Sequence, residues 1–216
     1  MDGDGELSKH RQKNDPPDSF VFDPRNPVPT RGGAVCCNPS IFPWGPMDQR
    51  PVERRPDVLV YTSGALKKDL EVTGPIKVVL HAATSAPDTD FTAKLVDVFP
   101  DGVARNLTDG ILRLRYRESL EKAVLATPGQ TYQITIDAGV TSNVFLKDHR
   151  IRLEISSSNF PRFDRNPNTG RAIAEETELR KASQTVYHDR TRPSYVLLPI
   201  VEHSAMFQEE TTPKAR

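Results

Sequence analysis

A short polar stretch carries side chains whose types and spacing could do chemistry. Arginine, aspartate and asparagine alternate within it, and a guanidinium group can bind a carboxylate through two parallel hydrogen bonds. Such side chains could line a pocket or dock onto a partner domain. They could equally form a network that ties the stretch to its own domain. The candidate interdomain or pocket residues are Asn159, Arg162, Asp164, Arg165 and Asn166.

The chain lacks the sequence signature of a serine or cysteine hydrolase. An α/β-hydrolase places its nucleophile on a sharp strand-to-helix turn flanked by glycines. No Gly-x-Ser or Gly-x-Cys occurs in the 216 residues, and no alternation of strands with helices is visible. We therefore predict no catalytic residue and no cofactor, and we expect the chain alone to hydrolyse nothing.

Metal ligands are also not expected. The histidines are scattered, and no two have the spacing of a zinc site. Asp88 and Asp90 resemble half of a calcium loop, but the remaining ligands are missing, so we expect Asp88 to bond backbone amides in a turn after Pro87. The five histidines are His10, His81, His149, His188 and His203.

A strand must position the polar stretch. Ile151, Leu153 and Ile155 alternate with charged residues, the pattern of a strand with one face in a core. From Ser156 to Gly170 the alternation stops, which predicts a long loop at the end of that strand. Phe160 and Phe163 lie inside it, and we expect both to pin it to the body of the domain.

Short alternating segments with many turns predict an all-β fold, a β-sandwich of jelly-roll topology. Pro100–Gly102 predicts a hairpin turn. The arginines of residues 112–117 are expected to form a solvated face that pairs with neighbouring carboxylates, and a binding site is the alternative. Ser194–Val201, apolar on both faces, predicts a central strand. Residues 172–183 are the only plausible helix, but their spacing is weak and also fits a charged loop with one helical turn. The predicted strands are 58–61, 69–74, 76–84, 91–99, 103–107, 112–117, 132–140, 149–156 and 194–201.

The composition limits the possible partners. The 29 basic and 29 acidic residues cancel, which argues against nucleic acid or an anionic membrane. No apolar run approaches eighteen residues, and the polar N-terminus is unlike a secretory signal. Cys36 and Cys37 are adjacent, so free thiols are expected. Together these features favour a cytoplasmic protein.

The proline-rich residues 1–34 are expected to form an irregular lead-in that wraps onto the sandwich. Residues 35–203 would then form the sandwich, and residues 204–216 a disordered tail.

Three segments carry a resemblance to a known family: residues 87–102, residues 106–120 and the polar stretch at residues 156–170. They closely resemble the X-Pro dipeptidyl-peptidase and cocaine-esterase-like hydrolases, in their C-terminal, non-catalytic domain only. The resemblance implies a jelly roll similar to galactose-binding modules. It also implies that the catalytic triad lies in an upstream α/β-hydrolase domain, which would be this chain's partner.

We therefore expect an accessory domain of a peptidase- or esterase-like serine hydrolase, with a structural and interdomain role. The alternative is a free-standing module that binds a ligand such as carbohydrate. Ile41, Phe42 and Trp44 follow one another in a turn-rich segment, where no strand alternation would bury them all. They predict an apolar docking patch and possible self-association.

Overall fold

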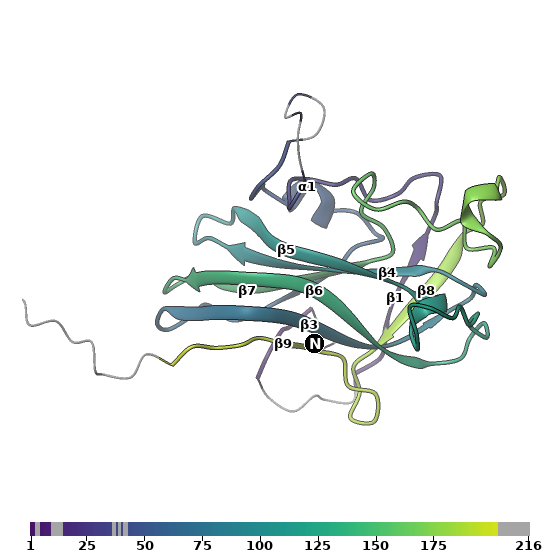
Figure 1. Ribbon diagram of the computed structural model, residues 1–216. Helices are drawn as coiled ribbons and strands as arrows, with labels where there is room; N and C mark the ends of the chain where they lie inside the picture. The colour runs from purple at the N-terminus through teal and green to yellow at the C-terminus, as the bar shows by residue number, and fades with distance from the viewer. Residues whose placement is uncertain (3–4, 10–14, 36–37, 39, 41–42, 203–216) are drawn as a thin grey trace, which may run out of the picture.

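The computed structural model describes residues 1–2, 5–9, 15–35, 38, 40 and 43–202, and these fold into two antiparallel sheets stacked face to face (Figure 1). The all-β sandwich expected from the sequence is confirmed. The five-stranded sheet contains β1 (Asp18–Phe22), β8 (Ala182–Tyr187), β3 (Leu70–Thr84) and β6 (Tyr132–Phe145) in that order, with β9 (Tyr195–Leu197) also paired to β3. The four-stranded sheet has the order β2 (Leu59–Thr62), β7 (Arg150–Ser156), β4 (Asp90–Val98), β5 (Ala104–Arg113).

Helical structure is limited to single turns. The described part of the chain contains α1 (Arg50–Glu53) and two 3₁₀ turns, Leu114–Tyr116 and Ile173–Glu175. Of the two alternatives for residues 172–183, the charged loop with one helical turn is confirmed, because only Ile173–Glu175 is helical and Ala182 already begins β8. None of these helices has the length and apolar character that crossing a membrane requires.

The core lies between the two sheets. Phe91, Leu95 and Leu153 of the four-stranded sheet are completely buried, as are Leu80 and Ile136 of the five-stranded sheet. Alternation along each strand brings these side chains to the inner faces, as the period of a strand requires.

The two outer faces differ. All nine residues of β4 are buried, so the outer face of the four-stranded sheet is covered as well. Figure 1 shows α1 and the loop after β7 on this outer side, and Val28, Val52 and Val58 of the covering segment form a small apolar cluster there. On the five-stranded sheet, β6 has an exposed outer face, with Val140 73% exposed.

Several predicted strands change their bounds. Residues 69–74 and 76–84 form one strand, β3, with a register shift between Pro75 and Lys77. The predicted hairpin at Pro100–Gly102 is confirmed, since it joins β4 to β5. The strand expected over residues 112–117 is wrong, because β5 ends at Arg113 and the chain turns into a 3₁₀ helix.

The central strand expected at Ser194–Val201 is also wrong. Only Tyr195–Leu197 is a strand, and Leu197 is 51% exposed. The lead-in at residues 1–34 contains β1, which pairs with β8 at the end of the five-stranded sheet. Ile41, Phe42, the two cysteines and the tail at residues 204–216 lie outside the described residues.

Candidate functional site

The loop after β7 lies against the proline-rich lead-in. The Val28 backbone N–H donates to Ser158 Oγ at 2.9 Å, and the Phe160 N–H donates to the Val28 carbonyl at 2.9 Å. The Thr30 N–H in turn donates to the Phe160 carbonyl at 2.7 Å. Two segments of irregular backbone therefore satisfy each other's polar groups where neither has a sheet partner.

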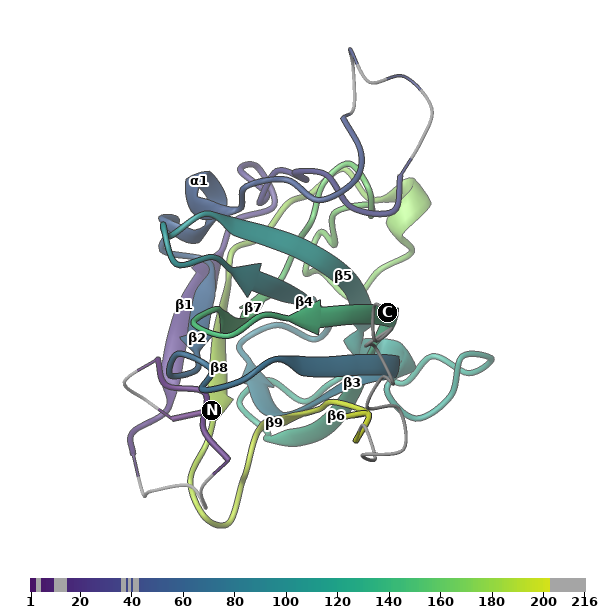
Figure 2. The same cartoon turned by 90° about the vertical axis from the view of Figure 1, so that its left-hand side faces the viewer.

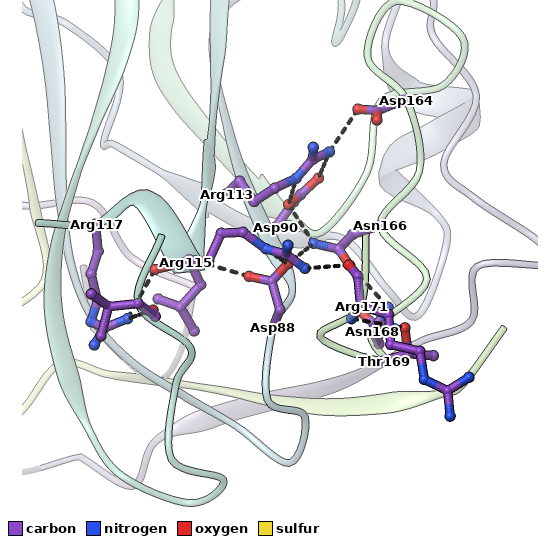
Figure 3. A network of polar contacts seen from close by, with 12 residues as sticks. Asp88, Asp90, Arg113, Arg115, Arg117, Asp164, Asn166, Asn168, Thr169 and Arg171 are labelled. Atoms are coloured by element: carbon purple, nitrogen blue, oxygen red, sulfur yellow. Dashed lines mark hydrogen bonds and ion pairs between the residues drawn. The ribbon is translucent and has the colours of Figure 1, made fainter. Parts of the chain in front are cut away.

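Asn166 is the centre of a buried polar network (Figure 3). It is 0% exposed, and its Nδ2 donates to Asp88 Oδ2 at 2.8 Å and to Asp90 Oδ1 at 2.9 Å. Its Oδ1 accepts the Asn168 backbone N–H at 2.9 Å. One amide side chain thus links the loop to two carboxylates at the start of β4 and also fixes the turn that follows it.

Two arginines saturate the same carboxylates. Arg113 donates from Nε to Asp90 Oδ1 at 3.0 Å and from Nη2 to Asp90 Oδ2 at 3.1 Å. Arg115 donates from Nε to Asp88 Oδ2 at 2.8 Å, and its backbone N–H donates to Asp88 Oδ1 at 2.9 Å. The predicted pairing of this arginine run with carboxylates is confirmed, but the predicted solvated face is wrong, because the Arg115 side chain is only 12% exposed. Asp88 accepts a backbone N–H, as predicted. The donor is Arg115, 27 residues further along the chain, and not a neighbour in the turn after Pro87.

A second set of contacts holds the beginning of the loop. Asn159 Nδ2 donates to Asp109 Oδ2 at 2.7 Å, and Arg162 Nη1 lies 3.0 Å from Asp109 Oδ1. Asp109 is 8% exposed and belongs to β5. Both ends of the loop are therefore tied to carboxylates on the covered face of the four-stranded sheet.

The five candidate residues consequently divide into two groups. Asn159 and Asn166 are buried, and Arg162 is mostly covered, with 17% of its side chain exposed. Asp164 keeps 60% of its side chain exposed while its Oδ1 accepts Arg113 Nη2 at 2.7 Å. Arg165 is exposed and donates to the Pro24 carbonyl at 3.1 Å. Only Asp164 and Arg165 present substantial surface to a partner.

The structure contradicts one of the two expected aromatic anchors. Phe160 is 40% exposed, so its predicted anchoring role is wrong, and Phe163 is half-buried beside the Arg162 guanidinium. Hydrogen bonds to charged groups hold this loop. The aromatic side chains were the misleading signal, because an apolar residue in a polar loop is only weak evidence of burial.

Burial changes the acidity of Asp90. Removal from water raises the pKa of Asp90 to about 6, and the hydrogen bond and charge of Arg113 oppose this effect. Asp88 lies close enough to add a smaller rise in the pKa of Asp90. The network therefore holds a carboxyl group that protonates at mildly acidic pH.

A further buried polar cluster lies under α1 and was not predicted from the sequence. Lys94 Nζ lies 3.1 Å from Glu154 Oε2 and donates to Gln49 Oε1 at 2.8 Å. Gln49 Nε2 donates to Asn106 Oδ1 at 3.0 Å, and Glu53 pairs with Arg152 at 2.7 Å. Burial is the main cause that raises the pKa of Glu154 to about 7, although Lys94 opposes it.

This cluster sits on outward-facing positions of β4 and β7, which a strand pattern assigns to solvent. One signal could have revealed it. Lys94 and Glu154 carry opposite charges and lie directly opposite each other in the pairing of β4 with β7.

The described histidines occupy structural positions. His149 Nδ1 lies 2.9 Å from Asp97 Oδ1, and both side chains are buried. His188 is 0% exposed and faces Asp18, which also accepts the Tyr61 hydroxyl at 2.8 Å. The described residues contain no group of three or more histidine, cysteine, aspartate or glutamate side chains able to hold a metal ion.

The candidate region around Asn166 is a network of charged hydrogen bonds that fixes the backbone of the loop after β7.

Comparison with known proteins places the chain in a family. The sequence model of the family described as the X-Pro dipeptidyl-peptidase C-terminal non-catalytic domain matches residues 1–197. Cocaine esterase from Rhodococcus sp. (strain MB1 Bresler) is 46% identical over 202 residues, covering 93% of this chain.

Two solved structures share the fold. An α-amino acid ester hydrolase superposes with a TM-score of 0.86 at 31% identity over 93% of this chain and 35% of that protein. An aminopeptidase from a marine sediment archaeon (Thaumarchaeota) gives a TM-score of 0.85 at 32% identity over 93% of this chain and 36% of that protein.

The chain spans only 35% of the length of the cocaine esterase that it matches. In such relatives the remaining polypeptide lies outside the matched domain and accounts for most of the protein. By its two-sheet fold and its matched residues, this chain belongs to the C-terminal non-catalytic domain family of the X-Pro dipeptidyl-peptidase and cocaine-esterase-like hydrolases.

Proposed function

We propose that this chain serves as the accessory domain of a serine ester hydrolase, and that it stabilises the α/β-hydrolase domain that carries the catalytic groups. The observation that carries the proposal is the match of residues 1–197 to a non-catalytic domain. In addition, arginine and asparagine donors of the domain itself already occupy the carboxylates of the polar network. A charged group whose lone pairs are already satisfied inside the domain is poorly suited to bind substrate.

Two of the relatives favour an ester substrate. Cocaine esterase and an α-amino acid ester hydrolase are among the proteins with the same domain. We propose that the intact protein cleaves an ester by acyl transfer and that the catalytic serine is supplied by the partner domain. A cytoplasmic location remains the prediction made from the sequence.

The contact with the hydrolase domain is proposed to use the exposed part of the covered side of the sandwich. Trp44 is 47% exposed, Phe160 is 40% exposed, and Asp164 and Arg165 add exposed charges nearby in the same loop as Phe160. An apolar centre with a polar rim is the composition of an interface between domains. The buried candidates Asn159 and Asn166 would act indirectly, because they fix the loop that presents these side chains.

A chimera tests the proposal. The matched 35% of the Rhodococcus cocaine esterase is replaced with this chain, and hydrolysis of an aryl ester is measured beside the native esterase and beside this chain alone. We expect the chimera to hydrolyse the ester and to melt in one transition, while this chain alone shows no turnover and no covalent label from a serine-directed inhibitor. A labelled serine in the isolated chain, or a folded chimera whose two parts melt independently, would refute the accessory function.

A further inference from the structure

One edge of β9 has no strand partner in the described part of the chain. β9 pairs with β3 at residues 77–79, and β8 pairs with β3 at residues 81–84. Since β6 pairs along the length of the opposite edge of β3, β8 and β9 must follow one another along the same edge. β1 pairs with the far side of β8, but no described strand pairs with the far side of β9. An unpaired strand edge is a template for an added strand.

An apolar groove of about 480 Å³ lies beside this edge. Its volume falls within the range of about 300–1,000 Å³ that is typical of ligand-binding sites. Ile200, which bridges to Val72, is 42% exposed at the groove. The aliphatic side chains that line it include Leu7, Leu66, Leu70, Ile151, Leu198 and Ile200.

Residue 1 lies in the same groove. Met1, at the point marked N in Figure 2, is 3% exposed and lines the groove. Its backbone nitrogen lies 3.4 Å from the carbonyl oxygen of Ser194, the residue before β9. The matched family is a C-terminal domain that accounts for 35% of the length of the esterase. In the relatives, the polypeptide that leads into this domain must therefore arrive next to β9.

We propose that the far edge of β9 and the groove beside it accept, as an added β-strand, the segment that immediately precedes this domain in the full-length hydrolases. The proposal rests on the accessory function above and names the surface through which the hydrolase polypeptide enters the domain. Backbone groups of the segment pair with β9, and alternate apolar side chains fill the groove, which is the mode of recognition called β-strand addition. The segment should be about five to six residues long, the usual length of a strand.

The proposal predicts the character of the segment. Side chains that face the groove must be large and apolar, because aliphatic residues line it. Leu197, which is 51% exposed, lines the same groove and adds to its apolar surface. A segment of alternating pattern, with apolar residues at every second position, fits this surface and leaves its other face to polar residues.

The test extends this chain at its N-terminus with roughly 20 residues that precede the matched region in the Rhodococcus esterase, a length that can reach along β9 and back. Melting temperature and amide hydrogen exchange are compared for the extended and unextended chains. We expect the extension to raise Tm by roughly 4 °C or more and to slow exchange of the β9 amides at least tenfold. A scrambled extension should do neither.

Two variants locate the effect. Ile200→Asp places a charge in the groove and should abolish both changes in the extended chain. Val144→Asp is the matched control, because Val144 is 45% exposed and Ile200 is 42% exposed. Val144 lies on the outer face of β6, so this substitution should leave the rise in Tm and the slower amide exchange intact. If the native extension protects no β9 amide, or if both variants behave alike, the strand-addition site is refuted.

The outcomes separate this inference from the accessory function. An active chimera combined with an extension that leaves β9 unprotected would overturn the strand-addition site alone. A dimer of the unextended chain that Ile200→Asp dissociates would assign the edge to a second copy and would also overturn it.

Discussion

The two outer faces of the sandwich contrast sharply. On the four-stranded sheet every residue of β4 is buried, and the outward positions carry charges such as Lys94, Asp90 and Glu154 under loops. On the five-stranded sheet the outward positions of β6 are open, and Val140 is 73% exposed. Charge is thus buried on one side, while the outward side chains of β6 on the other side are open to solvent. The loop after β7 on the four-stranded sheet is therefore held mainly by hydrogen bonds to charged groups, while Phe160 in that loop remains 40% exposed.

The largest effect is expected at the centre of the loop network. Asn166→Ala removes the donor shared by Asp88 and Asp90, so both buried carboxylates lose a hydrogen bond. We expect the free energy of unfolding to fall by about 3 kcal/mol. Denaturant titration measures it. Gln133→Ala, on the open face of β6, is the control and should change stability by less than about 0.5 kcal/mol. Equal effects of the two substitutions would remove the contrast between the faces.

The Lys94–Glu154 pair should behave as a unit. Lys94→Met leaves Glu154 buried without its cation, and we expect a loss of about 3 kcal/mol. The double variant with Glu154→Leu should recover most of that loss, since no uncompensated charge remains at either position. Lys77→Met, at an exposed position of β3, provides the control. Additive losses in the double variant would show that the two residues do not act as a pair.

The buried carboxyls predict an unusual pH dependence. The folded-state pKa of Glu154 is raised to about 7 and that of Asp90 to about 6, both above their unfolded values. The folded protein therefore binds these protons more tightly, so their contribution to stability is full below the unfolded pKa values and is lost as pH rises through 6 and 7. Unfolding free energy should increase by roughly 1–3 kcal/mol from pH 8 to pH 5.

The isosteric variant Glu154→Gln isolates this effect. It carries no titrating carboxyl group, so most of the rise between pH 8 and pH 6 should disappear in denaturant titrations across this range. Asp48, whose pKa is lowered to about 2 by Arg50, titrates outside the window. A slope that Glu154→Gln leaves unchanged would contradict the account.

The smallest effect is expected at the exposed aromatic of the loop. Phe160→Ala should cost less than about 1 kcal/mol in the isolated chain, because 40% of the residue is exposed and hydrogen bonds hold its backbone. The loss of about 3 kcal/mol that full burial would imply is not expected. A large loss at Phe160, measured in the same titration as Asn166→Ala, would reinstate the aromatic anchor.

The sequence predicted the parts of the fold that depend on local pattern. The alternation at Ile151, Leu153 and Ile155 identified β7, and Pro100–Gly102 identified the β4–β5 hairpin. It failed at the strand expected over 194–201. That segment is uniformly apolar, but its position at an edge of β3 depends on pairing across the chain, which periodicity does not report.

The candidate site was predicted in outline only. The loop and the pairing of Arg113 and Arg115 with carboxylates followed from residue types. The burial of Asn166, and the cluster around Lys94, could not be predicted because they depend on distant segments that cover a sheet face. A charged residue on the outward side of a strand normally indicates solvent, and only tertiary structure reverses that interpretation.

Native-state hydrogen exchange of the isolated chain tests the central claim most directly, namely that the loop is fixed from within the domain. The backbone N–H of Arg115 is bonded to Asp88, that of Asn168 to Asn166, and that of Phe163 to the Asn159 carbonyl. We predict that these amides exchange only with an opening free energy close to that of Leu95 in the core of β4, as members of one cooperative unit. Fast exchange of all three amides while Leu95 stays protected would contradict the account.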